Sequence, residues 1–320
     1  MTVCLPRVCN RIYHHHSSWL VALVILIQLI GLTACQTTTP ISAIDQLPRV
    51  LAVESFLADI SRNVAGDRLT VESLIPNGMD PHTFEPTPRD VVKIANSPIL
   101  IVNGAGLESW LSRTLANSGK PILVIEASSG LTPRKPASGE LVDEPTDPHF
   151  WLDPLSVVKY VENIRDGLCQ ADPGGCDSYR QNAEHYNTEL EQLDSWIKNQ
   201  VALIPPGIKL LITNHESFGY YADRYGFQVV GTIIPSVSTG AMPTALQLSE
   251  LIQKIKSSGA KAIFLEAGTN PQLAETIAAE TGVVIITDLI THTLTSTDGP
   301  APTYITMMQY DTQLIVNALK

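Results

Sequence analysis

The chain has 320 residues, of which 44% are hydrophobic and 17% are charged. This is the composition of a globular protein long enough to form two modest domains. A formal net charge of −11 argues against a nucleic-acid partner, because binding to phosphates requires basic surfaces.

The first 34 residues have the pattern of a bacterial lipoprotein leader. Arg7 and Arg11 precede an apolar run, Trp19 to Leu32, which is too short for a comfortable membrane span and ends in LTAC. We therefore predict that residues 1–34 are a signal peptide and that Cys35 is lipidated, which would hold an exported protein on the extracytoplasmic side of a membrane. An ordinary signal peptide or a single anchor helix is the alternative.

The next residues, 35–48, form a polar tether that contains proline. Beyond it, short apolar runs alternate with helix-like stretches, which is typical of α/β proteins. Eight such runs predict buried strands: RVLAVES, LTVESLIP, PILIVNG and ILVIEAS in the first half, then IKLLITN, VVGTIIP, AIFLEAG and VVIITD in the second. We predict two similar lobes, each a four-stranded, mostly parallel sheet with flanking helices and a separate core.

A long helix is predicted between the two lobes. From Tyr179 to Val201 the apolar side chains recur every three or four residues, and neither Gly nor Pro interrupts the pattern before Pro205. About 25 helical residues span roughly 37 Å, which makes a stiff linker. We therefore divide the chain into an N-terminal lobe (49–176), a linker helix (177–204) and a C-terminal lobe (205–320). A helix packed inside one large domain is the alternative.

Two further helices have marked beginnings. In TPRD, Thr87 is the expected N-cap, followed by Pro88 and by Asp90 at the third helical position. In DPLS, Asp153 is the expected N-cap, with Pro154 behind it.

Two cysteines remain beyond Cys35, and both lie in the segment LCQADPGGCD. Cys169 and Cys176 flank a Pro-Gly-Gly turn in a chain that we expect to be exported, so we predict a disulfide. A ring this small would contribute about 2–3 kcal/mol to stability. Two free thiols are the alternative.

The histidines that follow the leader suggest a metal site. His82 and His149 each follow Asp-Pro, and His215 follows the first strand of the second lobe. Asp288 ends the last predicted strand. All four therefore lie at the C-terminal ends of strands, where open α/β sheets bind ligands. Three imidazoles and one carboxylate would form a tetrahedral set suited to Zn²⁺. His185, at a polar position of the linker helix, we interpret as solvated.

Other residues near this set keep alternatives open. Glu216 could replace its neighbour in sequence as a ligand, and His292 could replace Asp288 if the intervening turn is helical. Glu266 and Glu85 could each accept a hydrogen bond from a ligand imidazole, although surface or capping roles are simpler.

Five segments, in order, carry a resemblance to a known family: NGMDPHTFEPTPRD, DPHFWLDP, NHESFGYYADRYG, FLEAGTNPQLAETIAAETG and YITMMQYDTQLIVNALK. They resemble the zinc/manganese ABC-transporter solute-binding proteins, a family of metal-binding lipoproteins, over nearly the whole mature chain. The resemblance implies two lobes joined by a long helix. It implies that His82, His149, His215 and Asp288 are the metal ligands. It also implies a monomeric binding protein that passes a divalent ion to an ABC permease with a cytoplasmic ATPase.

The residue at position 215 favours zinc. Family members that resemble manganese binders usually carry Glu there, whereas zinc-type members carry His. Imidazole nitrogen suits Zn²⁺, and Mn²⁺ prefers oxygen-rich sites, so we predict zinc, with manganese as the alternative. The chain departs from many zinc-type relatives in that its loop SSGLTPRKPASGELVDEPTD contains no His.

Two other classes of protein also hold a metal ion with such residues. A metallohydrolase needs an open coordination position and a general base, whereas Asp288 would fill the fourth position here. We therefore predict that the chain is not an enzyme. An adhesin with a structural metal ion would lose its fold without the ion, whereas a transport component should remain folded through its two cores and its linker helix.

Overall fold

The computed structural model describes residues 48–116, 119, 121–135 and 146–320. These residues belong to one compact unit. The predicted leader, Cys35 and nearly all of the tether lie outside the described residues, and so does part of the loop that precedes His149. In the described part of the chain, no helix has both the length and the apolarity to cross a bilayer.

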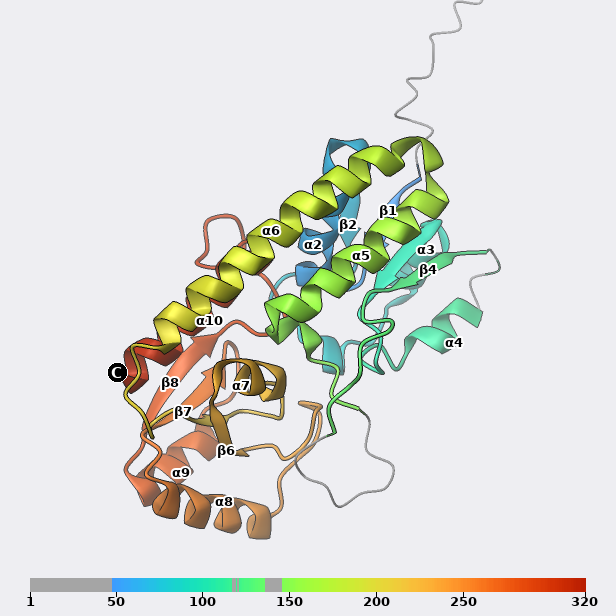
Figure 1. The fold of residues 1–320 in the computed structure, drawn as a ribbon. Helices are drawn as coiled ribbons and strands as arrows, with labels where there is room; N and C mark the ends of the chain where they lie inside the picture. Colours follow the sequence, from blue (N-terminus) through green and yellow to red (C-terminus); the bar gives the residue numbers. More distant parts are fainter. Residues whose placement is uncertain (1–47, 117–118, 120, 136–145) are drawn as a thin grey trace, which may run out of the picture. The chain divides into compact units, whose positions relative to one another are not determined.

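All eight predicted strands are present, and they form two separate four-stranded sheets (Figure 1). The first sheet has the order β2-β1-β3-β4 and the second the order β6-β5-β7-β8, and every pairing is parallel. The two sheets thus repeat one topology. The strands are β1 (Val50–Ala52), β2 (Val71–Ser73), β3 (Ile99–Val102), β4 (Leu123–Glu126), β5 (Leu210–Thr213), β6 (Gln228–Thr232), β7 (Ala262–Glu266) and β8 (Val284–Leu289).

Helices cover both faces of each sheet, which confirms the predicted α/β fold class. They are α2 (Ser55–Ala65), α3 (Pro88–Ala95), α4 (Leu111–Ala116), α5 (Pro154–Ala171), α6 (Cys176–Val201), α7 (Gly219–Tyr225), α8 (Ala245–Ser258), α9 (Gln272–Thr281) and α10 (Tyr304–Leu319). Two begin as predicted: Thr87 and Asp90 form a reciprocal capping box at α3, and Asp153 accepts a hydrogen bond from Leu155 N at α5.

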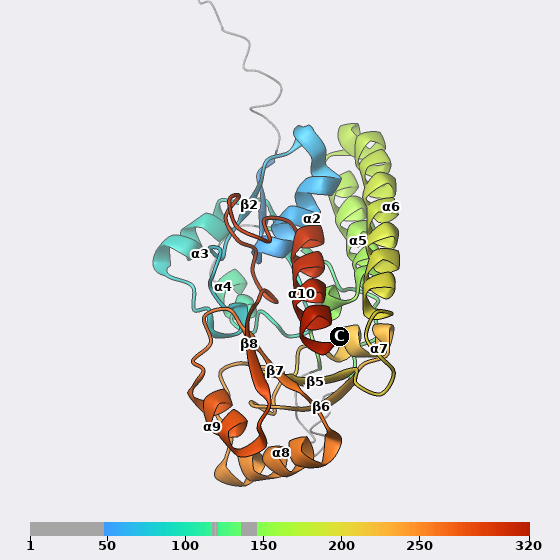
Figure 2. The same ribbon diagram turned by 90° about the vertical axis from the view of Figure 1, so that its left-hand side faces the viewer.

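The long helix α6 packs along α5 and also contacts α2 and α10 (Figure 2). Its buried stripe includes Tyr179, Tyr186, Leu193 and Val201, at the predicted helical spacing. Because α2 belongs to the first lobe and α10 to the second, α6 is packed against both. The prediction of a long helix that joins two lobes is therefore confirmed.

The hydrophobic core differs from the expected pair of separate cores. One cluster of buried side chains is continuous from Ile101 of the first sheet, through Tyr186 of α6, to Phe264 of the second sheet. Two smaller clusters cover the outer sheet faces, one beneath α3 and α4 and the other beneath α8 and α9. The reason is that α6 packs against α2 and α5, which contact the first sheet, and against α10, which contacts the second, so the two lobes share one interior.

The turn that begins α6 is held by covalent and ionic contacts. Cys169 at the end of α5 is disulfide-bonded to Cys176 at the start of α6, which confirms the predicted pairing. Between them, the Asp172 carboxylate accepts hydrogen bonds from the side chains of Arg68 and Tyr179. The Arg68 guanidinium lowers the pKa of Asp172 to about 2.

Candidate metal centre

Four histidines from four different loops meet between the two sheets. His82 lies in a single 3₁₀ turn (Pro81–Thr83) after β2, and His149 directly precedes another (Phe150–Leu152). His215 lies two residues beyond β5, and His292 three residues beyond β8. The nearest ring nitrogens of all four lie within 4.8 Å of one another.

Three of the six separations between these nitrogens are close to the edge length of a tetrahedral site. His82 Nε2 lies 3.1 Å from His149 Nε2 and 3.2 Å from His292 Nε2, and His149 Nε2 lies 3.2 Å from His215 Nε2. Four ligands at the usual Zn–N distance of about 2.0–2.1 Å form a tetrahedron with edges of roughly 3.3–3.4 Å. The imidazoles therefore surround a space of the size that one small divalent cation fills.

The two Asp-Pro-His motifs build the same local turn. The carboxylate of Asp80 accepts a hydrogen bond from His82 N at 2.9 Å, and that of Asp147 accepts one from His149 N at 3.0 Å. Asp147 Oδ1 also lies 2.8 Å from His149 Nδ1. This second bond leaves Nε2 of His149 as the nitrogen that faces the other rings.

The other two imidazoles are oriented by groups of the second lobe. His215 Nδ1 lies 2.9 Å from Glu266 Oε1, and Glu266 Oε2 lies 3.7 Å from His292 Nδ1. The hydroxyl of Thr291 lies 2.7 Å from the same nitrogen of His292. Glu266, foreseen as a possible acceptor for a ligand imidazole, thus faces two of the four rings. Glu85, the other such candidate, is exposed.

Burial keeps most of this cluster uncharged. It lowers the pKa of both His82 and His292 to about 3 and holds the pKa of His149 well below its ordinary value. Burial acts in the same direction on His215, but the charge of Glu266 outweighs it and raises the pKa of His215. At neutral pH three of the four rings are therefore neutral, which is the form that binds a metal ion.

Asp288, predicted as the fourth ligand, is not brought to the cluster. Its side chain is exposed, its Oδ2 accepts a hydrogen bond from the Thr287 hydroxyl at 2.7 Å, and its φ of 74° is left-handed. The pairing of β7 with β8 shifts by one residue between Phe264 and Glu266, so β8 contains an extra residue at this point. Such a bulge changes which side chains point to which face, and sequence alternation does not reveal it.

His292 occupies the position expected for Asp288, and the loop that carries it is bonded to the first lobe. Trp151 Nε1 donates to Thr291 O at 2.7 Å, and Gly78 N donates to the Thr293 hydroxyl at 2.8 Å. Leu294 N donates to the Ser55 hydroxyl at 2.8 Å. The sequence offered His292 as an alternative to Asp288, because it lies four residues further along the chain. No sequence pattern indicated the contacts that hold its loop.

The remaining histidine and acidic candidates lie apart from the cluster. His185 is solvated as predicted, with its side chain 77% exposed and 3.8 Å from Glu189. Glu216, the alternative to its neighbour His215, is half-buried and does not belong to the group of four.

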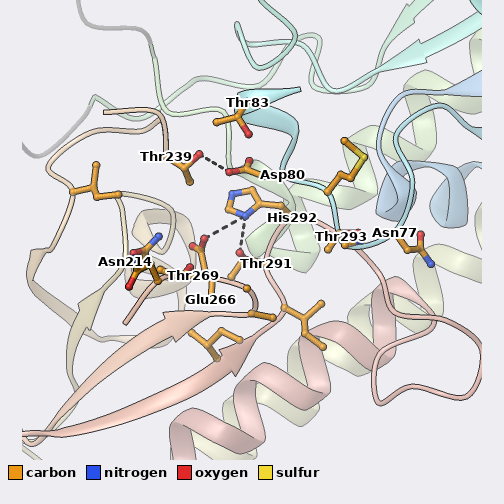
Figure 3. Close-up of a pocket in the computed structure, with 18 of the residues that line it drawn as sticks. Asn77, Asp80, Thr83, Asn214, Thr239, Glu266, Thr269, Thr291, His292 and Thr293 are labelled. Atoms are coloured by element: carbon orange, nitrogen blue, oxygen red, sulfur yellow. Dashed lines mark hydrogen bonds and ion pairs between the residues drawn. The ribbon is translucent and has the colours of Figure 1, made fainter. Parts of the chain in front are cut away.

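A cleft of about 880 Å³ opens on one side of the cluster. Asp80, Thr239, Glu266 and His292 all line it, and Figure 3 shows His292 between Asp80 on one wall and Glu266 on the other. His82 is half-buried, whereas His149 and His215 are both 0% exposed. The cluster therefore meets solvent on the side of His82 and His292.

Two parallel sheets joined by a long helix, with a closed set of imidazoles between them, define a two-lobed metal-binding protein of the solute-binding class. The comparisons agree with this class. Residues 50–318 match the family described as the periplasmic component A of zinc-uptake complexes, and the chain belongs to that family.

Related proteins are named for several metals. The manganese-binding lipoprotein MntA of Halalkalibacterium halodurans is 33% identical over 273 residues, which cover 85% of this chain and 88% of the relative. The iron ABC transporter substrate-binding lipoprotein MtsA of Streptococcus pyogenes serotype M1 is 29% identical over 296 residues, which cover 90% and 94%.

Solved structures share the fold. The periplasmic zinc-binding protein TroA of Treponema pallidum matches with a TM-score of 0.76 and 25% identity over 85% of this chain and 99% of that one. The Mn-bound periplasmic metal-binding protein of Candidatus Liberibacter asiaticus matches with a TM-score of 0.76 and 27% identity over 85% and 100%. These relationships confirm the predicted class: a metal-binding component of an ABC transport system on the extracytoplasmic side, and not an enzyme.

Proposed function

We propose that this protein captures Zn²⁺ outside the cytoplasmic membrane and delivers it to the permease of an ABC importer. The ion is held by His82, His149, His215 and His292, so the fourth ligand is an imidazole rather than the carboxylate of Asp288. The observation that carries the proposal is the set of four ring nitrogens, which lie within 4.8 Å of one another and are linked by three separations of 3.1–3.2 Å. Four imidazoles favour Zn²⁺, because Mn²⁺ prefers sites rich in oxygen.

The experiment is elemental analysis of the mature domain followed by a competition titration of Zn²⁺ against Mn²⁺. We expect about one Zn²⁺ per chain and a preference over Mn²⁺ of at least about a hundredfold. His215→Glu, which introduces oxygen, should narrow that preference by about tenfold or more. His185→Glu makes the same change on the exposed face of α6 and should leave the preference unaltered.

A wild-type preference for Mn²⁺ would contradict the zinc assignment. Manganese is the second candidate, because the relative that is 33% identical is named as a manganese-binding lipoprotein. In that case the His215→Glu variant should bind Mn²⁺ more tightly than the wild type does.

The proposal extends to anchoring and assembly. We propose that Cys35 carries the lipid that anchors the protein and that the protein is a monomer. We also propose that residues 49–176 and 205–320 act as the two lobes, joined by the helix 177–204. The LTAC motif and the lipoprotein names of the relatives support the anchor. Labelling with a radioactive fatty acid should mark the wild type and not Cys35→Ser. A ligand set completed within one chain supports the monomer, which sedimentation analysis would test.

A further inference from the structure

The two walls of the cleft are joined to each other very unequally. On the side of the His292 loop, the first lobe is bonded through Ser55, Asn77, Gly78 and Trp151 to the segment 291–295. On the opposite side lies the loop between β6 and α8, residues 233–244. Within the described part of the chain, one hydrogen bond joins this loop to the first lobe, from the Thr239 hydroxyl to Asp80 Oδ2 (Figure 3).

The Asp80 carboxylate uses its two oxygens for two different lobes. Oδ1 accepts from His82 N at 2.9 Å and thereby orders the turn that carries this ligand. Oδ2 accepts from Thr239 across the cleft. One side chain therefore couples the position of His82 to the position of the facing loop.

The facing loop is in turn fastened to the segment that carries His215. Ile234 N donates to Asn214 O at 2.8 Å, and Glu216 N donates to Ser236 O at 2.9 Å, so the loop is paired on both sides of His215. From there, Ser238 N donates to the Ser236 hydroxyl at 3.0 Å. A movement of Thr239 away from Asp80 would therefore pull on the strand end that holds His215.

This bond also lies at the cleft that reaches the cluster through His292. Asp80 and Thr239 both line the cleft of about 880 Å³ beside His292. At about 30 Å³ per water molecule, that space accommodates a fully hydrated cation. Because His149 and His215 are both 0% exposed, the side of the cleft is the side on which the cluster contacts solvent.

We propose that the Asp80–Thr239 hydrogen bond is a latch that keeps the His82 and His215 sides together over the bound ion and limits the rate of its release. The inference rests on the proposed function, since it concerns the same site. Opening begins at this bond. His292 remains with the first lobe through the bonds of segment 291–295, while the loop 233–244 moves away from Asp80.

The test is the rate of Zn²⁺ release from the loaded mature protein, measured by rapid mixing with excess chelator. Thr239→Val removes the hydroxyl and keeps the shape, and it should release Zn²⁺ about tenfold faster, because a hydrogen bond to a charged acceptor is lost. Thr239→Ser restores the hydroxyl and should release at nearly the wild-type rate. Thr269→Val is the matched control, since Thr269 lines the same cleft and is also half-buried.

The outcomes separate the latch from the binding function. All variants should bind one ion and show the same absorption spectrum with Co²⁺ in place of Zn²⁺, because no ligand is changed. Release of Zn²⁺ from Thr239→Val at the wild-type rate would overturn the latch proposal, and so would an equal acceleration of release in Thr269→Val. Neither result would contradict the metal site. A wild type that binds no Zn²⁺ would overturn the site itself.

Discussion

The two Asp-Pro-His segments have one sequence and two different surroundings. In both, the aspartate accepts a hydrogen bond from the backbone N–H of the histidine two residues later, at 2.9 Å for His82 and 3.0 Å for His149. The proline between them restricts φ and stiffens the turn. The motif alone therefore determines the local geometry in both lobes.

The surroundings determine what each aspartate does next. Asp147 is buried, bonds the imidazole of His149 as well as its backbone, and accepts a hydrogen bond from the Tyr220 hydroxyl at its carbonyl. Asp80 is half-buried and reaches across the cleft to Thr239. The same motif thus holds a fully buried ligand, His149, in one place and a ligand beside the cleft, His82, in the other.

Replacing each of the two histidines should have the largest effect on metal affinity. His149→Ala and His82→Ala should each weaken Zn²⁺ binding by about a hundredfold or more, because four ligands share an apparent binding energy of roughly 10–16 kcal/mol. In the metal-free protein, His149→Ala should also cost about 1–3 kcal/mol in the free energy of unfolding, because the buried Asp147 carboxylate loses a hydrogen-bond partner. His82→Ala should cost less. Titration calorimetry and urea denaturation measure the two quantities.

Equal losses of stability in the two metal-free variants would show that the deeper burial of the His149 segment does not affect the free energy of unfolding. His185→Ala serves as the control for both measurements, since this side chain is 77% exposed on α6. It should change neither the affinity nor the stability.

Replacing the two aspartates should give a smaller, unequal effect. Asp147→Asn weakens the acceptor that orients His149, and loss of such a partner lowers metal affinity by about 10–100-fold. Asp80→Asn should lower it by less than about fivefold, because an amide still offers an acceptor to His82 N and a donor to Thr239. Competition titration with a chelator of known affinity compares the two, and similar losses would contradict the different roles.

The pH dependence of the metal-free protein should show opposite signs for His82 of the first segment and Asp147 of the second. Burial lowers the pKa of His82 to about 3, so between that pH and its ordinary value of 6.5 the unfolded chain holds a proton that the folded chain lacks. His82 therefore reduces stability as the pH falls below 6.5. Burial raises the pKa of Asp147 from 3.8 to about 7, so the folded chain holds the extra proton and Asp147 reduces stability as the pH rises through that window.

Urea denaturation between pH 6.5 and 5.5 measures these signs. His82→Asn should make the loss of stability on acidification shallower by about 1 kcal/mol per pH unit, and Asp147→Asn should make it steeper by about the same amount. Changes of the same sign in both variants would show that His82 and Asp147 do not act in opposite directions.

Much of the architecture could be read from the chain. Apolar runs such as PILIVNG and AIFLEAG are buried strands because a parallel sheet covered on both faces needs continuous hydrophobic sequence. The helical periodicity from Tyr179 to Val201 became α6, and the spacing of Cys169 and Cys176 across Pro-Gly-Gly became a disulfide. These features depend on residues close together in the chain, where pattern and geometry are directly related.

That the two lobes share one continuous core could not be read in this way. The stripe on α6 shows that one face is buried but not what covers it. Its contacts with α2 and with α10 come from opposite ends of the chain, and together they produce one continuous interior. Which apolar faces share a core is decided by packing.

The sequence by itself determined the eight strands, the long helix and the two Asp-Pro-His turns, and it singled out His82, His149 and His215 as candidate ligands. Only the tertiary structure decided that His292 rather than Asp288 faces them. A one-residue bulge beside Asp288 and the hydrogen bonds from Trp151 and Gly78 to the following loop set that outcome. The physical reason is that local patterns specify elements, whereas the meeting of four loops depends on register and on bonds between residues more than a hundred positions apart.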